Sequence, residues 1–209
     1  MRLKRNYNLW ECNLRIAQQV LIQLSIQTFY KNNTILPAHT PINKIKQIPF
    51  ATGSLGHGLS IAAGFGFAFK LKKNDNRVFC ITSDGGINEG STWEAMLFIT
   101  HHQLTSVVWF IDRNRYQGFG YTEEILALEP LDKKLEAFGF TVIEINGHDI
   151  EQILATEKFF SSCTKPVVVI ADTIKGNGWD EMSNTMESHY LPMKEQDYTS
   201  FINKLQHEE

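Results

Sequence analysis

The sequence predicts an α/β protein built on a doubly wound, mostly parallel sheet with helices on both faces. Short runs rich in Val, Ile and Phe alternate along the chain with longer stretches of helical periodicity. Two of these runs, residues 106–111 and 166–171, are apolar almost throughout, as strands buried on both faces require. The chain has 209 residues, of which 43% are hydrophobic, so it can bury one large core.

The predicted elements follow one another in the order of successive βαβ units. Residues 53–58 form a glycine-rich turn, and the small residues of the helix after it would let that helix approach a sheet closely. Residues 31–50 contain three prolines and show no regular element, and residues 173–193 are expected to form a loop over the sheet edge. We expect strands at residues 77–82, 106–111, 140–145 and 166–171, and helices at residues 8–30, 59–71, 88–101, 130–138, 149–159 and 195–205.

Composition argues against several classes of protein. A net charge of −3 and a pI of about 6.2 indicate neither a nucleic-acid partner nor an anionic membrane. No apolar run approaches the roughly 20 residues that span a bilayer, and glutamines interrupt the apolar stretch near the N-terminus, which makes it a poor signal peptide. Cys12, Cys80 and Cys163 show no metal-ligand spacing, so we expect reduced thiols in a cytoplasmic protein.

Polar residues follow two of the predicted strands at the point where each strand ends. Asp84 comes after strand 77–82, and Asn114 comes after strand 106–111. If the two strands are parallel neighbours, their ends lie about 5 Å apart and the two side chains converge. A carboxylate and an amide oxygen are hard ligands that suit Mg²⁺ or Ca²⁺, and a backbone carbonyl such as that of Tyr116 could supply a third ligand.

Two glycines after Asp84 point to an anion beside the cation. Gly85 and Gly86 leave backbone N–H groups open at the start of a predicted helix, where the helix dipole favours negative charge. Phosphate oxygens and a water would complete the cation's coordination, so the pattern suits a metal-bound diphosphate. The dipeptide Asp-Gly alone is more typical of a plain strand-to-helix turn, and that interpretation stays open at this point.

Five segments in the same order resemble the thiamine-diphosphate enzymes of the transketolase family, in particular the diphosphate-binding N-terminal subunit of bacterial split transketolases. Asp84-Gly85 followed by Asn114 is similar to the family's thiamine-diphosphate motif, and the resemblance covers about residues 50–193. The segments are Thr52-Gly-Ser-Leu-Gly-His-Gly-Leu59, Ser83-Asp-Gly-Gly-Ile-Asn-Glu-Gly-Ser-Thr-Trp-Glu-Ala95, Ala127-Leu-Glu-Pro-Leu131, Glu144-Ile-Asn-Gly-His-Asp149 and Thr173-Ile-Lys-Gly-Asn-Gly178.

The resemblance implies a set of site residues for thiamine diphosphate and Mg²⁺ (or Ca²⁺). Asp84, Asn114 and the carbonyl of Tyr116 would bind the metal ion. Glu89 would link two cofactor sites across a subunit interface, and His189 would close over the diphosphate and the reacting carbon, which makes these two the catalytic candidates; the alternative for His189 is a solvated loop histidine. The cofactor-binding residues would also include Gly53, Leu55, Gly56, His57, Gly85, Gly86 and Gly118.

The resemblance also implies a partner. In the family, the glutamate that activates the cofactor lies on a pyrimidine-binding domain, and this chain ends at Glu209, before such a domain. We therefore expect a short N-terminal helix and irregular segment at residues 1–50, a thiamine-diphosphate-binding domain at residues 51–209, and a separate C-terminal subunit that supplies the glutamate. The family-like assembly of the two chains is α₂β₂. The reaction would transfer a two-carbon ketol unit between sugars or sugar phosphates.

Two departures from the family pattern keep other functions open. Ser83 replaces the first glycine of the motif, and only 51 residues precede the turn that starts at Thr52, with His39 as their one histidine and without the family's histidine-bearing segments. A non-catalytic or regulatory paralogue is therefore an alternative. The α subunit of a 2-oxoacid dehydrogenase would use the same site for other chemistry, and a flavodoxin-like nucleotide module would fit the βα pattern alone.

Overall fold

The computed structural model describes residues 31–32, 50–191 and 194–207, and its centre is a four-stranded parallel sheet. The strand order is β1-β2-β6-β5, and every neighbouring pair in this sheet is parallel. The predicted fold class is confirmed. The predicted helix at residues 8–30 and nearly all of the loop at residues 31–50 lie outside the described residues. The strands are β1 (Val78–Ser83), β2 (Val107–Arg113), β5 (Thr141–Asn146) and β6 (Val167–Asp172).

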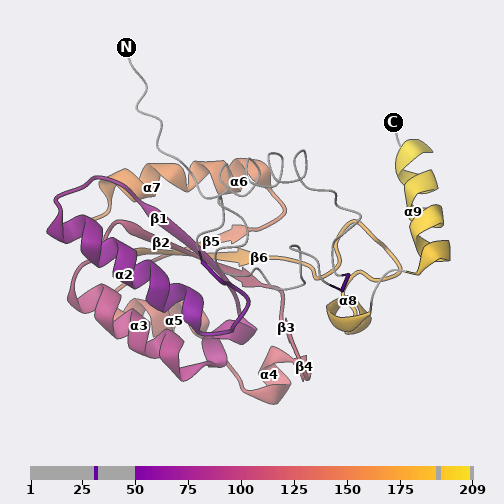
Figure 1. The fold of residues 1–209 in the computed structure, drawn as a ribbon, viewed down its shortest axis with the longest axis horizontal. Helices are drawn as coiled ribbons and strands as arrows, with labels where there is room; N and C mark the ends of the chain where they lie inside the picture. Colours follow the sequence, from indigo (N-terminus) through magenta and orange to yellow (C-terminus); the bar gives the residue numbers. More distant parts are fainter. Residues whose placement is uncertain (1–30, 33–49, 192–193, 208–209) are drawn as a thin grey trace, which may run out of the picture.

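Helices cover both faces of the sheet, as a doubly wound fold requires (Figure 1). One face carries α2 (His57–Leu71), α3 (Gly90–His101) and α5 (Leu131–Phe138). The other face carries α6 (Ile150–Ala155) and α7 (Glu157–Ser162), which lie along the top of the view in Figure 1. The predicted elements in this part of the chain are therefore present, with ends shifted by one to three residues.

Strand β2 runs through the middle of the core, which explains why its sequence is apolar over residues 107–111. Val107, Trp109 and Ile111 pack into the cluster under α2, α3 and α5, while Val108 and Phe110 pack into the cluster under α6 and α7. All five side chains are buried. Successive residues of a strand point to opposite faces, so a strand buried on both sides cannot alternate with polar residues.

Helix α2 approaches the sheet as closely as its small residues predict. A methyl group added at Gly66 would come 2.5 Å from Val107 Cγ2, which is closer than real contacts of this kind. Ala62 and Ala63 on the same helix are also buried. Gly64 differs from Gly66, because a methyl group there would meet no atom within 4 Å. Packing against β2 thus requires a glycine at position 66 but not at position 64.

The structure departs from the predicted elements in four places. The predicted helix at residues 149–159 is interrupted at Thr156, whose N–H and Oγ1 both donate to the carbonyl of Ile153, at 3.2 and 2.7 Å. The predicted helix at residues 88–101 is preceded by a 3₁₀ turn, η2. The predicted loop at residues 173–193 contains a short helix, and a hairpin with another short helix follows β2. These elements are η2 (Gly85–Asn88), β3 (Tyr116–Gln117), β4 (Gly120–Tyr121), α4 (Thr122–Ile125) and α8 (Glu187–Tyr190), and the chain ends in α9 (Glu195–His207).

In the described part of the chain, no helix is both long enough and apolar enough to cross a membrane. Cys80 is buried in the core and Cys163 is half-buried, and both are free thiols. Burial raises the pKa of the Cys80 thiol to about 12, so this cysteine is an unreactive core residue at neutral pH.

Candidate functional site

The candidate site begins where two neighbouring strands end. β1 and β2 pair in parallel with Ser83 opposite Asp112, and the Asp84 N–H donates to the Asp112 carbonyl at 3.1 Å. Asp84 and Asn114 therefore leave the sheet at the same edge, and they are only 2% and 6% exposed. The convergence expected from the sequence is present, while the role of the two residues as metal ligands stays a prediction.

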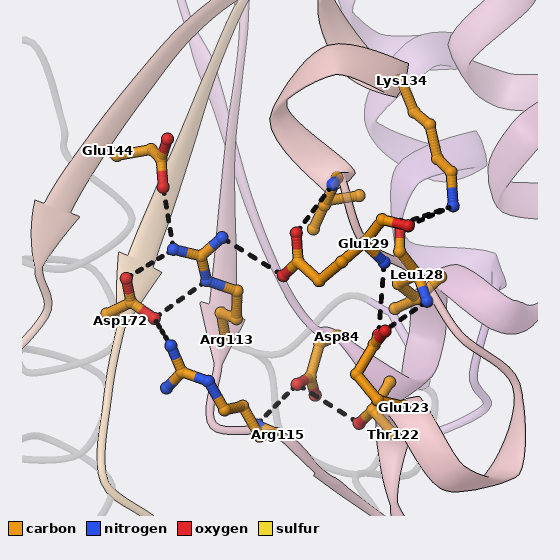
Figure 2. A network of polar contacts seen from close by, with 11 residues as sticks. Asp84, Arg113, Arg115, Thr122, Glu123, Leu128, Glu129, Lys134, Glu144 and Asp172 are labelled. Carbon is orange, nitrogen blue, oxygen red and sulfur yellow. Dashed lines mark hydrogen bonds and ion pairs between the residues drawn. The ribbon is translucent and has the colours of Figure 1, made fainter.

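Backbone N–H groups surround the oxygens of both side chains. The carboxylate of Asp84 accepts hydrogen bonds from the Arg115 N–H at 2.6 Å and from Thr122 Oγ1 at 3.4 Å (Figure 2). It also accepts one from the Gly85 N–H at 2.8 Å. Asn114 Oδ1 accepts a hydrogen bond from the Tyr116 N–H at 3.0 Å. The turn after β2 is thus folded around the oxygens of the two candidate ligands.

The Tyr116 carbonyl, the third expected ligand, belongs to the hairpin β3–β4. Tyr116 pairs with Tyr121 in this hairpin, and the Thr122 N–H donates to the Arg115 carbonyl at 2.9 Å. Along an antiparallel ladder, hydrogen-bonded residue pairs alternate with pairs that exchange no backbone hydrogen bond. Since the neighbouring residues Arg115 and Thr122 are hydrogen-bonded, the pair Tyr116–Tyr121 is one that exchanges no backbone hydrogen bond. This register directs the carbonyl of Tyr116 away from β4, to the side on which its N–H meets Asn114.

The electrostatics of Asp84 suit a cation. Burial raises the pKa of its carboxyl group, the hydrogen bonds from Arg115 and Gly85 lower it, and the nearby Asp112 raises it again. No Lys, Arg or His of the described residues forms an ion pair with Asp84. A buried carboxylate without a positive partner is costly, and a divalent cation would offset that cost.

The protein alone supplies too few ligands for a closed metal site. Among the residues that the structure describes, no group of three or more His, Cys, Asp or Glu side chains could hold a metal ion. A cation here would depend on one carboxylate, one amide, one backbone carbonyl and oxygens from outside the chain. That donor set fits Mg²⁺, which commonly keeps phosphate and water ligands. The residues present therefore fit a metal-bound diphosphate.

The glycine-rich turn before α2 lies beside the turn after β1. Gly56 has a φ of +75°, and a methyl group there would come 2.7 Å from Glu89 Cβ. Ser91 Oγ donates to the Gly56 carbonyl at 3.0 Å. Leu55 reaches the other turn, since its Cδ2 lies 3.9 Å from where a methyl group on Gly86 would be. The structure thus brings Leu55, Gly56, Gly86 and Glu89 together, although their segments are separate in sequence.

The remaining expected residues take different positions around these two turns. Gly53 has a φ of +112° and is exposed, as is His57, whose Nδ1 lies 2.9 Å from the Leu55 carbonyl. Gly118 lies in the loop between β3 and β4. His189 lies on α8 and is not a hydrogen-bond partner of Asp84 or Asn114. Burial, and then the charge of Lys175, lowers the pKa of His189, which keeps its imidazole neutral at neutral pH.

The segment that carries α8 is attached to the hairpin. The Tyr116 hydroxyl donates to the Asn184 carbonyl at 2.5 Å, and it lies 3.0 Å from the Tyr121 hydroxyl. Burial and the bond to Tyr121 raise the pKa of Tyr116 to about 12, so this hydroxyl stays protonated and can donate at neutral pH. The segment that precedes α8 and His189 is therefore held to the hairpin of the candidate site through Tyr116.

A network of charged residues, which the sequence patterns did not predict, supports the strand edge beneath the site (Figure 2). We call it the Arg113 network, and its members are Arg113, Arg115, Glu129, Glu144 and Asp172. Arg113 is 11% exposed and pairs with Asp172 through two bonds of 2.8 and 2.5 Å, with Glu144 at 2.8 Å and with Glu129 at 3.4 Å. Arg115 pairs with the same Asp172 at 2.7 Å.

The Arg113 network includes the two residues on either side of Asn114. The arginines immediately before and after Asn114 are both held by Asp172 at the end of β6, and the N–H of Arg115 is the one that donates to Asp84. The hydrogen bonds to Asp172 raise the pKa of Arg113 above its ordinary value and lower the pKa of Asp172. The network thus fixes the backbone on both sides of a candidate ligand.

Replacing Arg113 by methionine should destabilise the protein by about 2 kcal/mol, because three carboxylates would lose their shared partner. Urea unfolding measures the effect, and Lys133→Met, which removes an exposed ion-pairing cation, should cost less than about 0.5 kcal/mol.

The lowered pKa of Asp172 means that its contribution to stability is present above its ordinary pKa of 3.8 and is lost as the pH falls below that value. The difference between wild type and Arg113→Met should therefore shrink in acid, and a difference independent of pH would contradict this account.

Comparisons with known proteins agree with the fold described above. The family model described as "Transketolase, thiamine diphosphate binding domain" matches residues 20–208. A subunit of the apulose-4-phosphate transketolase of Actinobacillus succinogenes is 37% identical over 165 residues, which are 79% of this chain and 60% of that protein. The 6-deoxy-6-sulfo-D-fructose transketolase subunit SqwG of Clostridium sp. is 34% identical over 184 residues, covering 88% of this chain and 67% of that protein.

Solved transketolases share the fold. The transketolase of Campylobacter jejuni superposes with a TM-score of 0.79 at 29% identity, over 85% of this chain and 29% of that one. The transketolase of Leishmania mexicana gives a TM-score of 0.80 at 23% identity, over 93% of this chain and 31% of that one, and shows the fold alone. Both likenesses place the α/β sheet of this chain among the folds of transketolases.

The chain belongs to the transketolase family, in the part that the family model describes as the thiamine diphosphate binding domain. It spans about 60% of the length of the apulose-4-phosphate transketolase subunits that it resembles. The resemblance that the sequence suggested is confirmed at the level of the family.

Proposed function

We propose that this chain is the diphosphate-binding subunit of a split transketolase that uses thiamine diphosphate and Mg²⁺ (or Ca²⁺). The observation that carries the proposal is the pair of buried oxygen ligands, Asp84 and Asn114, at adjoining strand ends, where Asp84 has no ion-pair partner among the described residues. The family model, described as a thiamine diphosphate binding domain, supports the same cofactor, and the names of the relatives as transketolase subunits support the same reaction. The metal ligands in this proposal are Asp84, Asn114 and the carbonyl of Tyr116.

When bound, thiamine diphosphate supplies the carbon that accepts the two-carbon ketol unit of the sugar donor. The chain's own residues hold and orient the diphosphate end. In this proposal the turn of Gly85 and Gly86 lies beside the phosphates, and the turn with Leu55 and Gly56 forms the adjacent wall. The N–H groups of the two glycines are not open as the sequence led us to expect, because they donate to Asp84 Oδ1 at 2.8 Å and to Ser83 Oγ at 3.2 Å. In this proposal Gly53, His57 and Gly118 line the same site, and residues 51–209 form the binding domain.

Glu89 and His189 are the catalytic candidates of the proposal. Glu89 is exposed beside the Gly56 turn, where a second chain can reach it. His189 has a lowered pKa and lies on the segment that Tyr116 holds. A neutral imidazole there can accept a hydrogen bond from substrate hydroxyls or donate one to the diphosphate. Each role requires the cofactor and the second chain to be in place.

A separate partner completes the proposed enzyme. The relatives from Actinobacillus succinogenes and Clostridium sp. are named as subunits of transketolases. On this chain, large apolar side chains stand exposed on the hairpin and α4, with Phe119 89% exposed, and such a patch suits a protein interface. The patch consists of Phe119, Tyr121, Ile125 and Leu126. We propose that a pyrimidine-binding C-terminal subunit covers this edge, supplies the activating glutamate, and assembles with this chain as α₂β₂ in the cytoplasm.

The chain alone should show no ketol transfer, and addition of a pyrimidine-binding subunit should produce it. The reason is that the activating glutamate is proposed to come from the second chain. Coupled assays of ketose-to-aldose transfer, run with each chain alone and with both, measure the effect. Normal turnover by the chain alone would overturn the partner proposal, and decarboxylation of a 2-oxoacid without ketol transfer would overturn the proposed reaction.

Calorimetry with thiamine diphosphate and Mg²⁺ tests the cofactor part of the proposal separately. Binding that requires the divalent cation is the expected result. Absence of cation-dependent binding, with or without the partner, would indicate the non-catalytic alternative instead.

A further inference from the structure

Gln117 stands directly over the turn that is proposed to hold the diphosphate. A methyl group added at Gly85 would come 2.8 Å from Gln117 Cβ and 3.9 Å from its Oε1. Gln117 is the last residue of β3 and is fixed by its pairing with Gly120 across the hairpin. Its side chain therefore begins within contact distance of the Gly85 backbone, next to the candidate metal ligands.

The amide nitrogen of Gln117 lacks an acceptor in the part of the chain that the structure describes. Nε2 is buried and has no hydrogen-bond partner among the described residues. Buried amide donors are nearly always paired in folded proteins, because an unpaired one loses its bonds to water without replacement. Asn88 Nδ2, at the end of η2, is a second buried amide nitrogen without a partner in the described part of the chain. An acceptor from outside the chain is the simplest explanation for Gln117, given the position of its side chain.

The surroundings of Gln117 indicate the chemistry of that acceptor. The residue lies one position after Tyr116 and three after Asn114, on the hairpin whose first residues are folded around the cation ligands. A cation held by Asp84 and Asn114 would carry phosphate oxygens into this region. A neutral amide donor suits a phosphate oxygen whose charge the cation already balances in part.

We propose that Gln117 Nε2 donates a hydrogen bond to an oxygen of the diphosphate, which makes Gln117 a further cofactor-binding residue of the site. This inference rests on the proposed function of the same site. It explains why Gly85 must lack a side chain, since the Gln117 side chain occupies the space where one would lie.

Gln117→Met should change ligand affinity and stability in opposite directions. Methionine has a similar shape but no donor, so Mg²⁺-dependent binding of thiamine diphosphate and of inorganic pyrophosphate to the 209-residue chain should weaken about 10-fold or more. The melting temperature of the ligand-free chain should stay the same or rise, because a buried unpaired donor is removed. Isothermal calorimetry and thermal unfolding measure the two quantities. A residue with a purely structural role would lower the melting temperature instead.

Two further variants sharpen the test. Gln117→Glu keeps the shape but faces the diphosphate with a carboxylate, so it should bind less tightly than Gln117→Met. Gln196→Met makes the same substitution at an exposed position of α9 and should leave affinity unchanged.

The outcomes distinguish a failure at Gln117 from a failure of the proposed function. If wild type binds neither ligand with Mg²⁺, the proposed function fails and the inference fails with it. If wild type binds, Asp84→Asn does not, and both Gln117 variants bind as wild type does, the inference alone is overturned. Lower melting temperature with unchanged affinity in the Gln117 variants also overturns it, since that result assigns the side chain a structural role.

Discussion

Replacing Asp84 by asparagine should weaken Mg²⁺-dependent binding of thiamine diphosphate by about 100-fold or more. The loss of a residue that only orients a metal ligand already lowers metal affinity about 10–100-fold, and Asp84 is proposed to bind the metal itself. The substitution keeps the size of the side chain and removes the buried negative charge proposed to hold the cation. Titration of the chain with Mg²⁺ at fixed thiamine diphosphate, followed by calorimetry, measures the effect.

Asp75→Asn is the matched control for this experiment, because Asp75 is an exposed aspartate in the loop between α2 and β1. It should bind as wild type does. Thermal unfolding of both variants without ligand shows whether the fold is kept. Wild-type affinity in a folded Asp84→Asn protein would remove the basis of the proposed cation site.

Gly66→Ala should destabilise the protein by about 1–3 kcal/mol, the usual cost of forcing an extra methyl group into a packed core. The added carbon would come 2.5 Å from Val107 Cγ2 and 3.2 Å from Ser106 Oγ, so helix α2 or the start of β2 must move. Urea unfolding of the two proteins measures the change in the free energy of unfolding.

Gly64→Ala is the control on the same helix and should have the opposite sign. A methyl group there meets no atom within 4 Å, and alanine favours the helix over glycine by about 0.5–1 kcal/mol. Gly64→Ala should therefore stabilise the protein. Equal effects at the two positions would show that packing against β2 does not explain the glycine at position 66.

The fold was predictable because its signals are local. Apolar runs such as residues 106–111 are typical of buried strands, and their alternation with helical patterns leaves the parallel α/β sheet as the consistent arrangement. The meeting of Asp84 and Asn114 followed from the same reasoning, since parallel neighbours end at one edge. The family assignment followed from short ordered motifs, and it is confirmed.

Some features that the sequence did not predict depend on contacts between distant segments, and one depends on a local side-chain hydrogen bond. Arg113 and Asp172 are 59 positions apart, and only the strand order β1-β2-β6-β5 brings them together. The break at Thr156 depends on a side-chain hydroxyl that competes with the helix for one carbonyl. Gln117 gave no signal in the sequence, because a single glutamine after a turn is ordinary, and its meaning comes from the burial of its amide beside Gly85.

Residues 172–184, at the end of β6 and after it, are bonded at two points to residues 113–116. At the start of this stretch, Asp172 holds both arginines that flank Asn114, and further on, the carbonyl of Asn184 holds the Tyr116 hydroxyl. A ligand that rigidifies residues 113–116 would thereby damp the motion of residues 172–184 as well. Amide hydrogen exchange across that stretch should slow when the metal-bound cofactor is added, even at residues that never touch it.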